Sequence, residues 1–327
     1  MLPSDMPRKR LIKVSAKTNP NYGKYPDEIT VNELLKNGFI NLDKPSGPTS
    51  HQVDAWVKEI LQIEKAGHGG TLDPAVTGVL PIAVGEATRA LQVLLSAGKE
   101  YIGIMKLHKN VEKDKIKSVC DSFIGEIYQI PPLRSAVKRV RRKREIYYFN
   151  IIQIKDSDVL FRVGCEGGTY IRTLCVDVGR KLGCGAHLSE LRRTRVGCLT
   201  EDSSVTLQDV KDAYTFWKEE NDEGDVRLKI QPLIKLFEHL PKIVIRDSAV
   251  DALCHGANLA IPGIVEIDTE IKKGDQAAVL TLKNEVVALV TVLMSTEQII
   301  QKDSGMCANL DRVLMNKGTY PSIWKKT

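Results

Sequence analysis

The sequence has few of the features that mark membrane, disulfide-linked or metal-binding proteins. No window contains about 18 apolar residues without a charge, and the first residues, MLPSDMPRKRLIKV, lack the apolar core of a secretory signal. The seven cysteines include no C-x-x-C pair, which argues against a zinc site or a redox couple. We therefore expect a soluble intracellular protein with reduced thiols, no membrane contact and no metal.

Cofactor motifs are also missing. The chain has no G-x-x-x-x-G-K-[ST] loop, no dinucleotide-binding loop and no HExxH helix. We therefore expect chemistry that needs no cofactor. The net charge is only +6, from 47 Lys and Arg against 41 Asp and Glu. Binding to a polyanion must then depend on where the basic residues lie.

The 327 residues are enough for two domains, each with its own core. Residues 1–35 predict an extended arm that orders only against another part of the chain, and we expect it to pack on the C-terminal domain. Residues 36–240 alternate strand-like and helix-like segments, and the acidic stretch at 218–225 marks their end. Residues 241–327 contain short β-rich runs between turns. The predicted fold class is α+β, with a mixed sheet, flanking helices and a small C-terminal β-barrel.

Two helices have a clear period of 3.6 residues. The first should start with Thr49 or Ser50 as its N-cap, and the second should be capped by Thr169 and end at Gly183. Their predicted apolar faces are Val53, Trp56, Val57, Ile60 and Leu61, and Ile171, Leu174, Cys175, Val178 and Leu182. The other predicted elements are a helix at 87–95 and strands at 39–42, 79–84, 101–107, 147–155 and 159–165.

The segment AGHGGTLDPAVTG is too rich in Gly, Thr and Pro to be a helix or an ordinary strand. It predicts a shaped loop in which Asp73 stands among small residues that let a ligand approach the backbone. The structural alternative is a plain turn, which Asp-Pro often begins. Composition leaves both interpretations open.

Several motifs carry a family resemblance. GHGGTLDPAVTG resembles the catalytic motif of the TruB family of pseudouridine synthases, and GFINLDKPSGPTSHQV, AGKEYIG, GGTYIRTL and GAHLSELRRTRVG stand in the family's order. PPLRSAVKR, IRDSAVDALCHGANLAIPGI and TYPSIWKK are similar to the dyskerin branch in its archaeal form, whose C-terminal barrel is a PUA domain. A long Lys-rich tail is missing and the arm is short. The expected location is therefore an archaeal cytoplasm, or the nucleolus if the source were eukaryotic.

The resemblance implies three catalytic residues. The family's aspartate nucleophile falls on Asp73, which would add to sugar or base while the uracil detaches, rotates and rejoins through carbon. Tyr101 of KEYIG would stack on the flipped-out uridine, although a half-buried strand tyrosine is the structural alternative. Arg172 of TYIRT would pair with Asp73 and keep it ionised despite burial, unless it is a solvated helix-face arginine.

Other residues are expected to contact substrate RNA or to support the loop. His68 would hold the flipped-out RNA or the loop, because its spacing from Asp73 suits neither a triad nor a metal site. Leu191 resembles the family's pocket-lining leucine, and Lys44 with Pro45 should brace the catalytic loop. The basic run KRVRRKR predicts RNA contact, with a solvated loop as the alternative, and its charged members are Lys138, Arg139, Arg141, Arg142, Lys143 and Arg144. The arginines of LRRTR, Arg192, Arg193 and Arg195, should extend the same basic surface.

In the barrel, likeness to PUA domains implies that guide RNA lies near HGANLAIPG, at His255, Gly256, Ala257 and Asn258, although the segment could be a mere β-turn. The predicted function is guide-RNA-directed pseudouridine formation in rRNA and tRNA by the catalytic subunit of an H/ACA ribonucleoprotein. Alternatives are a stand-alone tRNA T-loop enzyme and a non-catalytic RNA-binding scaffold. Expected partners are the guide RNA, a zinc-containing Nop-type scaffold protein, a Gar-type protein and a kink-turn-binding ribosomal-type protein.

Overall fold

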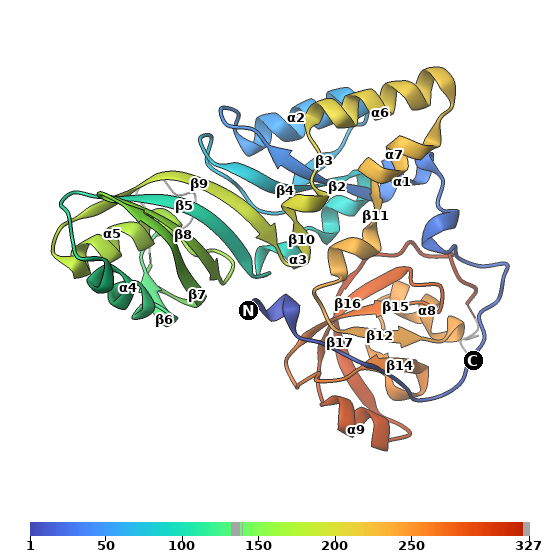
Figure 1. Cartoon of the computed structure of the whole chain (residues 1–327). Helices are drawn as coiled ribbons and strands as arrows, with labels where there is room; N and C mark the ends of the chain where they lie inside the picture. The colour runs from blue at the N-terminus through green and yellow to red at the C-terminus, as the bar shows by residue number, and fades with distance from the viewer. Residues whose placement is uncertain (132–137, 139, 323–327) are drawn as a thin grey trace. The chain divides into compact units, whose positions relative to one another are not determined.

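The computed structural model describes residues 1–131, 138 and 140–322. Its contacts form two compact units, shown in Figure 1. The sheet unit contains residues 1–5 and 40–229, and the barrel unit contains residues 6–39 and those from 230 onward. These units divide the chain at 39/40 and 229/230, whereas the sequence prediction placed the boundaries at 35/36 and 240/241.

One large, mostly antiparallel sheet organises the sheet unit. Its strand order is β2-β4-β9-β5-β8-β7-β6, with β3 paired to β4 and β10 paired to β9. β5 is antiparallel to both β8 and β9, whereas β4 and β9 are parallel. The strands are β2 (Gly38–Lys44), β3 (Ala66–His68), β4 (Thr77–Val84), β5 (Lys99–Leu107), β6 (Gly125–Gln129), β7 (Arg142–Lys155), β8 (Asp158–Cys165), β9 (Ala186–Val196) and β10 (Leu199–Thr200).

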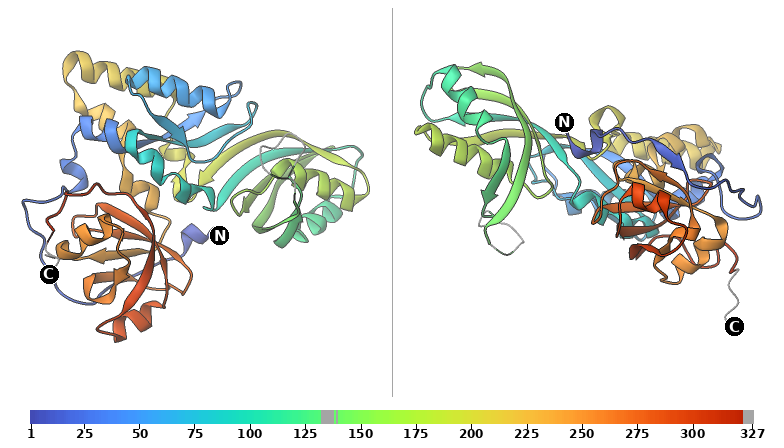
Figure 2. Two further views of the ribbon diagram at one scale, coloured as in Figure 1. Left: turned by 180° about the vertical axis from the view of Figure 1, so that it is seen from behind. Right: turned by 90° about the horizontal axis from the view of Figure 1, so that it is seen from below.

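Helices of the sheet unit gather in two places. Near β3, α2 lies beside α6, and at the other end of the sheet α4 and α5 lie together against β7 and β9 (Figures 1 and 2). The helices are α2 (Ser50–Leu61), α3 (Gln92–Leu95), α4 (Lys113–Asp121), α5 (Ile171–Leu182), α6 (Leu207–Glu220) and α7 (Glu223–Lys229). Within the described residues, none of the protein's helices combines the length and the apolarity that a membrane crossing requires.

Helix α2 starts as predicted but faces the core differently. Thr49 is the N-cap, and its hydroxyl accepts a hydrogen bond from the backbone of Gln52. The predicted apolar face was wrong at Trp56, which is 41% exposed. The buried positions instead include Ser50 and Asp54, because this side of the helix faces the loop that carries Asp73. Two polar side chains of α2 are thereby placed beneath that loop.

Helix α5 buries all five predicted apolar residues and ends at Gly183, whose φ of +74° favours glycine. Its N-cap is Tyr170 and not Thr169, since the Thr169 hydroxyl donates to the carbonyl of Glu166 instead. The predicted helix at 87–95 was also wrong. It is a 3-10 turn (Gly85–Ala90) followed by the short α3, with backbone hydrogen bonds that span three residues.

The basic run was expected in a loop, but its second half lies in a strand. β7 begins at Arg142, five residues earlier than predicted, because β6 pairs with its first residues. Lys138 and Arg141 precede the strand. Arg139 lies outside the described residues, as do residues 132–137 and 323–327, which carry parts of the PPLRSAVKR and TYPSIWKK motifs.

The barrel unit is a seven-stranded sheet around an apolar core. Its strand order is β1-β14-β12-β15-β16-β17-β13, and Ile243, Val250, Ile267 and Val290 are among the core residues. The elements are β1 (Arg10–Ile12), α1 (Val31–Asn37), β11 (Gln231–Pro232), β12 (Lys242–Ile245), α8 (Asp247–Cys254), β13 (Leu259–Ala260), β14 (Ile264–Asp268), β15 (Gln276–Leu280), β16 (Val286–Val292), α9 (Thr296–Gln301) and β17 (Met306–Val313).

The N-terminal arm contributes to this unit directly. Its strand β1 pairs with β14, and the hydroxyl of Thr18 donates to the carboxylate of Asp247. The ammonium of Lys283 donates to the carbonyls of Pro20, Tyr22 and Gly23. A segment without a core of its own is thus ordered by hydrogen bonds to the barrel.

Candidate active site

Asp73 lies on the loop between β3 and β4, and this loop is tied down on both sides. The backbone of Leu72 exchanges two hydrogen bonds with the buried hydroxyl of Ser50, which donates to the carbonyl at 3.1 Å and accepts from the amide at 2.9 Å. The amide of Val76 donates to the carbonyl of Asp73, which closes a turn, and the amide of Gly47 donates to the carbonyl of Pro74. The loop therefore presents Asp73 in a defined position.

Lys44 holds the same loop from β2. Its fully buried ammonium donates to the carbonyls of Pro45, Pro74 and Val76 at 2.8 to 2.9 Å. Burial lowers the pKa of Lys44, and the nearby Asp73 carboxylate opposes this shift. With three carbonyl acceptors the lysine acts as a brace, which is the role that the sequence suggested for it.

Asp73 and Arg172 form a direct ion pair. The guanidinium Nη2 lies 2.5 Å from Oδ2 of the carboxylate, although the two residues are 99 positions apart. The first turn of α5 carries Arg172 towards the loop. The expectation that Asp73 is buried was wrong, because the side chains are 57% and 58% exposed. The pair is therefore open to a substrate from solvent.

Tyr101 lies on the central strand β5, opposite Arg193 of β9. Its side chain is buried, with the whole residue only 7% exposed, and its phenol oxygen accepts a hydrogen bond from the Arg193 guanidinium. Burial raises the pKa of Tyr101. The phenol therefore stays protonated at neutral pH, and only a small part of the ring is accessible to a base.

Two buried cationic side chains, Arg193 and Lys99, support this region, and the sequence did not reveal their burial. Arg193 donates to the carbonyls of Val79 at 2.7 Å and Gly70 at 3.1 Å, so it links β9 to the loop before Asp73. Gly78, with a φ of +102°, makes room for it, because a Cβ there would lie 2.1 Å from the carbonyl oxygen of Arg193. Lys99 donates to three carbonyls between residues 94 and 97, and burial lowers its pKa to about 7.

His68 is tied to the loop and to α2. Its Nδ1 lies 2.6 Å from Oδ2 of Asp54, and its Nε2 lies 3.3 Å from the hydroxyl of Thr71. The Asp54 carboxylate favours the proton on Nδ1, which leaves Nε2 towards Thr71. Of the two roles considered for His68, the contacts agree with holding the loop, and RNA contact stays a prediction.

Leu191 lies on β9 beside Gly103 of β5, where the missing side chain gives it space. It is partly exposed and so is not fully part of the core. Its accessibility is compatible with a pocket-lining role.

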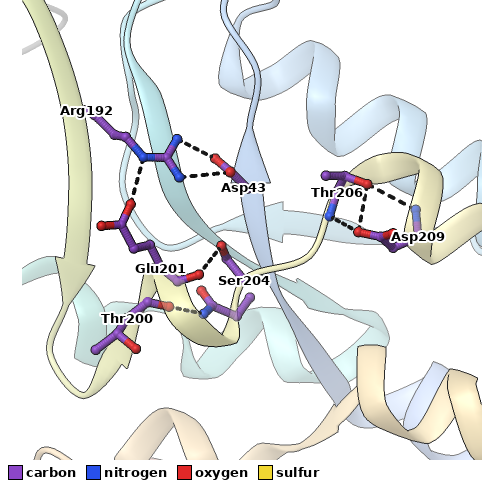
Figure 3. A network of polar contacts seen from close by, with 8 residues as sticks. Asp43, Arg192, Thr200, Glu201, Ser204, Thr206 and Asp209 are labelled. Atoms are coloured by element: carbon purple, nitrogen blue, oxygen red, sulfur yellow. Dashed lines mark hydrogen bonds and ion pairs between the residues drawn. The ribbon is translucent and has the colours of Figure 1, made fainter.

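The prediction that LRRTR extends a basic surface was wrong. Arg192 pairs with Asp43 through two hydrogen bonds of 2.9 Å and with Glu201 at 2.7 Å (Figure 3). Arg193 is buried, and Arg195 pairs with Asp5. Carboxylates and carbonyls of the chain itself occupy all three guanidinium groups, so they add little to an external positive field.

The basic run at 138–144 is far more accessible. The guanidinium of Arg141 lies 4.4 Å from the ring centre of Tyr128, and Lys143 pairs with Glu126 at 2.5 Å. Arg144 lies 3.6 Å from Glu166. Lys138 and Arg141 are exposed, whereas Arg142 is partly buried. Lys143 and Arg144 are thus paired locally, whereas Lys138 and Arg141 face solvent.

In the barrel unit, the four predicted guide-RNA residues follow α8 and are exposed. Nδ1 of His255 is bonded to the carbonyl of Asp251, and Oδ1 of Asn258 accepts from the amide of Leu310. Gly256 and Ala257 complete the turn. The segment is thus an ordered surface turn next to β17.

Comparisons with known proteins agree with this geometry. The TruB family pseudouridylate synthase N-terminal domain matches residues 58–171, and the tRNA pseudouridylate synthase B C-terminal domain matches residues 172–238. A PUA domain matches residues 241–314, and a DKCLD (NUC011) domain matches residues 2–54. Together these matches extend over most of the chain.

Relatives are similar along their full length. "Probable tRNA pseudouridine synthase B" of Methanosarcina barkeri is 53% identical over 99% of this chain and 96% of the relative. The protein of the same name from Methanopyrus kandleri is 54% identical over 99% and 96%. A solved Cbf5-Nop10-Gar1 complex contains a chain with a TM-score of 0.93 and 52% identity, covering 99% of both chains. A chain of an H/ACA RNP bound to a substrate RNA containing 2'-deoxyuridine has a TM-score of 0.91 and 49% identity, covering 99% of this chain and 100% of that one. This chain therefore belongs to the TruB family of pseudouridylate synthases, in its archaeal dyskerin-type branch with a PUA domain.

Proposed function

We propose that this protein converts uridine into pseudouridine in RNA with Asp73 as its nucleophile, as the catalytic subunit of an H/ACA guide-RNA particle. The observation that carries the proposal is the ion pair between Asp73 and Arg172 on an exposed, braced loop. The pair engages Oδ2 of Asp73, and we assign Oδ1 to the addition to the sugar or the base. No oxidant or energy source is needed, because bonds are exchanged within one nucleotide.

Tyr101 and His68 are proposed to receive the flipped-out uridine. Since the phenol of Tyr101 is protonated at neutral pH, Tyr101 offers a neutral ring edge to the base. His68, Leu191 and five members of the basic run, Lys138, Arg139, Arg141, Arg142 and Arg144, are proposed to contact the substrate RNA. The exposure of Lys138 and Arg141 supports this assignment.

The guide-directed part of the proposal is supported by the similar chains in complexes with Nop10, Gar1 and substrate RNA. We propose that this chain likewise binds a guide RNA, a Nop-type and a Gar-type protein, and a kink-turn-binding protein. Residues 241–327 would act as the PUA domain, with His255, Gly256, Ala257 and Asn258 near the guide, residues 36–240 as the catalytic domain, and residues 1–35 as the arm. The expected location is the cytoplasm of an archaeon.

A second candidate function is modification of tRNA without a guide, because the archaeal relatives are named as tRNA enzymes. Both candidates use the same site and differ only in how the uridine is chosen. A non-catalytic scaffold is disfavoured, since Asp73, Tyr101 and Arg172 are all present.

The test measures pseudouridine in a guide-matched RNA and in tRNA, each with and without guide and partner proteins. The guided function requires that modification of the matched RNA depends on the guide, and modification of tRNA by the chain alone would favour the second candidate. Asp73→Asn should abolish both reactions while RNA affinity stays nearly unchanged, because the amide keeps the shape and loses the nucleophilic charge. Turnover of Asp73→Asn near the wild-type rate would remove Asp73 from its role.

A further inference from the structure

Three potential metal ligands meet beside the catalytic loop. His51 and Asp54 lie on the first turns of α2, and His68 is the last residue of β3. One ligand atom from each lies within 4.8 Å of the other two. The two imidazole rings meet edge to face, with centroids 4.9 Å apart. Neither Asp73 nor Arg172 belongs to this cluster.

We propose that His51, Asp54 and His68 form a binding site for a divalent transition-metal ion of the zinc class. Two imidazoles and one carboxylate with an open fourth position are a donor set that Zn²⁺ and Co²⁺ accept. Ligands about 2.1 Å from a tetrahedral ion lie about 3.4 Å from one another. Oδ2 of Asp54 lies 2.6 Å from Nδ1 of His68 and 3.8 Å from Nδ1 of His51, so small side-chain rotations reach that spacing.

A second observation comes from the carboxylate itself. The side chain of Asp54 is about nine-tenths buried, and its Oδ1 has no hydrogen-bond partner within the part of the chain that the structure describes. The cations recorded within ion-pair distance of Asp54 are the two imidazoles, which are charged only when protonated. Leaving a buried carboxylate oxygen unsatisfied is costly. A metal ion would supply the missing positive charge, and on its binding to Nδ1 of His68 the proton of that imidazole would move to Nε2.

The three ligands differ in their exposure to solvent. The His68 side chain is 9% exposed, whereas that of His51 is 85% exposed. His51 can therefore swing onto an arriving ion, while Asp54 and His68 are already held in place by their short hydrogen bond. This arrangement has two preorganised ligands and one exposed ligand.

A bound ion would couple α2 to the catalytic loop. His68 also contacts Thr71, which precedes Asp73 by two positions. If His68 contacts substrate RNA, as the proposed function assumes, then the ion and the RNA compete for the same imidazole and each weakens the binding of the other. Ions of this class should then slow pseudouridine formation.

The binding test needs no catalytic activity. Full-length protein is freed of metal with a chelator and titrated with Co²⁺, and the visible absorption bands of the bound ion are recorded. We expect one saturable site without the near-ultraviolet thiolate band that cysteine ligands would give. His51→Ala should weaken binding at least tenfold, because it removes a direct ligand. Absence of saturable binding, or a thiolate band, would overturn the proposal.

A matched control comes from a second histidine pair in the same unit. Nε2 of His108 lies 3.0 Å from Nδ1 of His187, and this pair is exposed, but no carboxylate among the described residues completes a ligand cluster with it. His187→Ala should leave Co²⁺ affinity unchanged. If His187→Ala abolished binding and His51→Ala did not, the ion would be at the other pair and our site would be wrong.

The regulatory part is tested separately. Without metal, His51→Ala should turn over like the wild type, and added Co²⁺ should slow the wild type but not this variant. Equal inhibition of both proteins would overturn the competition while leaving the binding result intact. Lack of turnover in metal-free wild type would instead count against the proposed function.

Discussion

Two arginine-rich segments look alike in the sequence and differ in the structure. The run at 138–144 and the LRRTR segment of β9 are both densely positive, and both were predicted to face RNA. The first keeps accessible charge at Lys138 and Arg141. In the second, every guanidinium is engaged by the chain itself. Local charge density therefore does not distinguish an RNA-binding surface from an internal brace.

The difference follows from where the two segments lie in the sheet. β9 runs between β4 and β5, and its arginines find acceptors within the same unit: the Val79 carbonyl of β4, Asp43 of β2, Glu201 after β10, and Asp5 near the N-terminus. β7 pairs with the edge strand β6, which offers fewer acceptors. A central position makes arginine an internal donor, whereas a position near an edge leaves it for a partner.

The largest effect should come from Arg193→Met. This change keeps most of the side-chain volume but leaves the carbonyls of Val79 and Gly70 and the phenol of Tyr101 without their donor. Unpaired buried acceptors cost about 1–3 kcal/mol each, and removal of the buried Arg193 charge offsets part of this cost, so the variant should lose roughly 2–5 kcal/mol of unfolding free energy. Denaturant unfolding measures this loss.

Pseudouridine formation by Arg193→Met should fall as well, because Gly70 lies on the catalytic loop. If the unfolding free energy fell by less than about 0.5 kcal/mol, Arg193 would not stabilise the loop, and the two arginine-rich segments would not differ as described.

The next largest effect is expected on RNA binding by the basic run at 138–144. Charge reversal of Arg141, Arg142 and Arg144 should weaken RNA binding and flatten the slope of log affinity against log salt by about 0.9 for each lost phosphate contact. Binding titrations at several salt concentrations provide the measurement.

Arg180→Glu is the matched control, since Arg180 is exposed on α5 outside the run. Its salt slope should equal that of the wild type. If the variant with Arg141, Arg142 and Arg144 reversed also had the wild-type salt slope, the run would be a solvated segment that does not bind RNA.

Arg192→Ala should lower folding stability slightly and leave RNA binding unchanged. Its pairs with Asp43 and Glu201 are well aligned but about one-third exposed, so solvent screening limits the loss to about 1 kcal/mol. The salt dependence of RNA binding should not change. A flatter slope would place Arg192 at the RNA surface after all.

Much of the site could be predicted from the sequence, because family motifs report residues that are far apart along the chain. The pairing of Asp73 with Arg172 and the bracing role of Lys44 were both expected, and both contacts are present. The boundaries of β2, β4, β5 and β8 were close, because their apolar runs are clear. Helix α5 followed from its period alone.

Other features depended on tertiary contacts that no local pattern encodes. Arg193 and Lys99 are charged and would normally be exposed, so only the carbonyls around them explain their burial. Asp54 was not among the residues of the predicted apolar face, and its partner His68 is 14 residues away. The exposure of Trp56 likewise depends on which side of α2 the loop occupies.

The smallest effect is expected at the ion pair between Glu126 and Lys143, which neutralises part of the charge of the run at 138–144. Glu126 of β6 pairs with Lys143 of β7, and hydrogen bonds from Lys143 and Tyr128 lower the pKa of Glu126. Glu126→Gln should release Lys143 towards RNA, so the RNA affinity should rise by a few-fold at most and the slope of log affinity against log salt should steepen by less than about 0.9.

The ion pair between Glu126 and Lys143 is complete above the ordinary carboxyl pKa and is lost as the pH falls through the lowered pKa of Glu126. The two proteins should therefore bind RNA differently at neutral pH and become alike in acid, as binding titrations over a pH series would measure. If Glu126→Gln bound RNA no more tightly than the wild type at neutral pH, Lys143 would not belong to the RNA surface, and the accessible segment would be reduced to its arginines and Lys138.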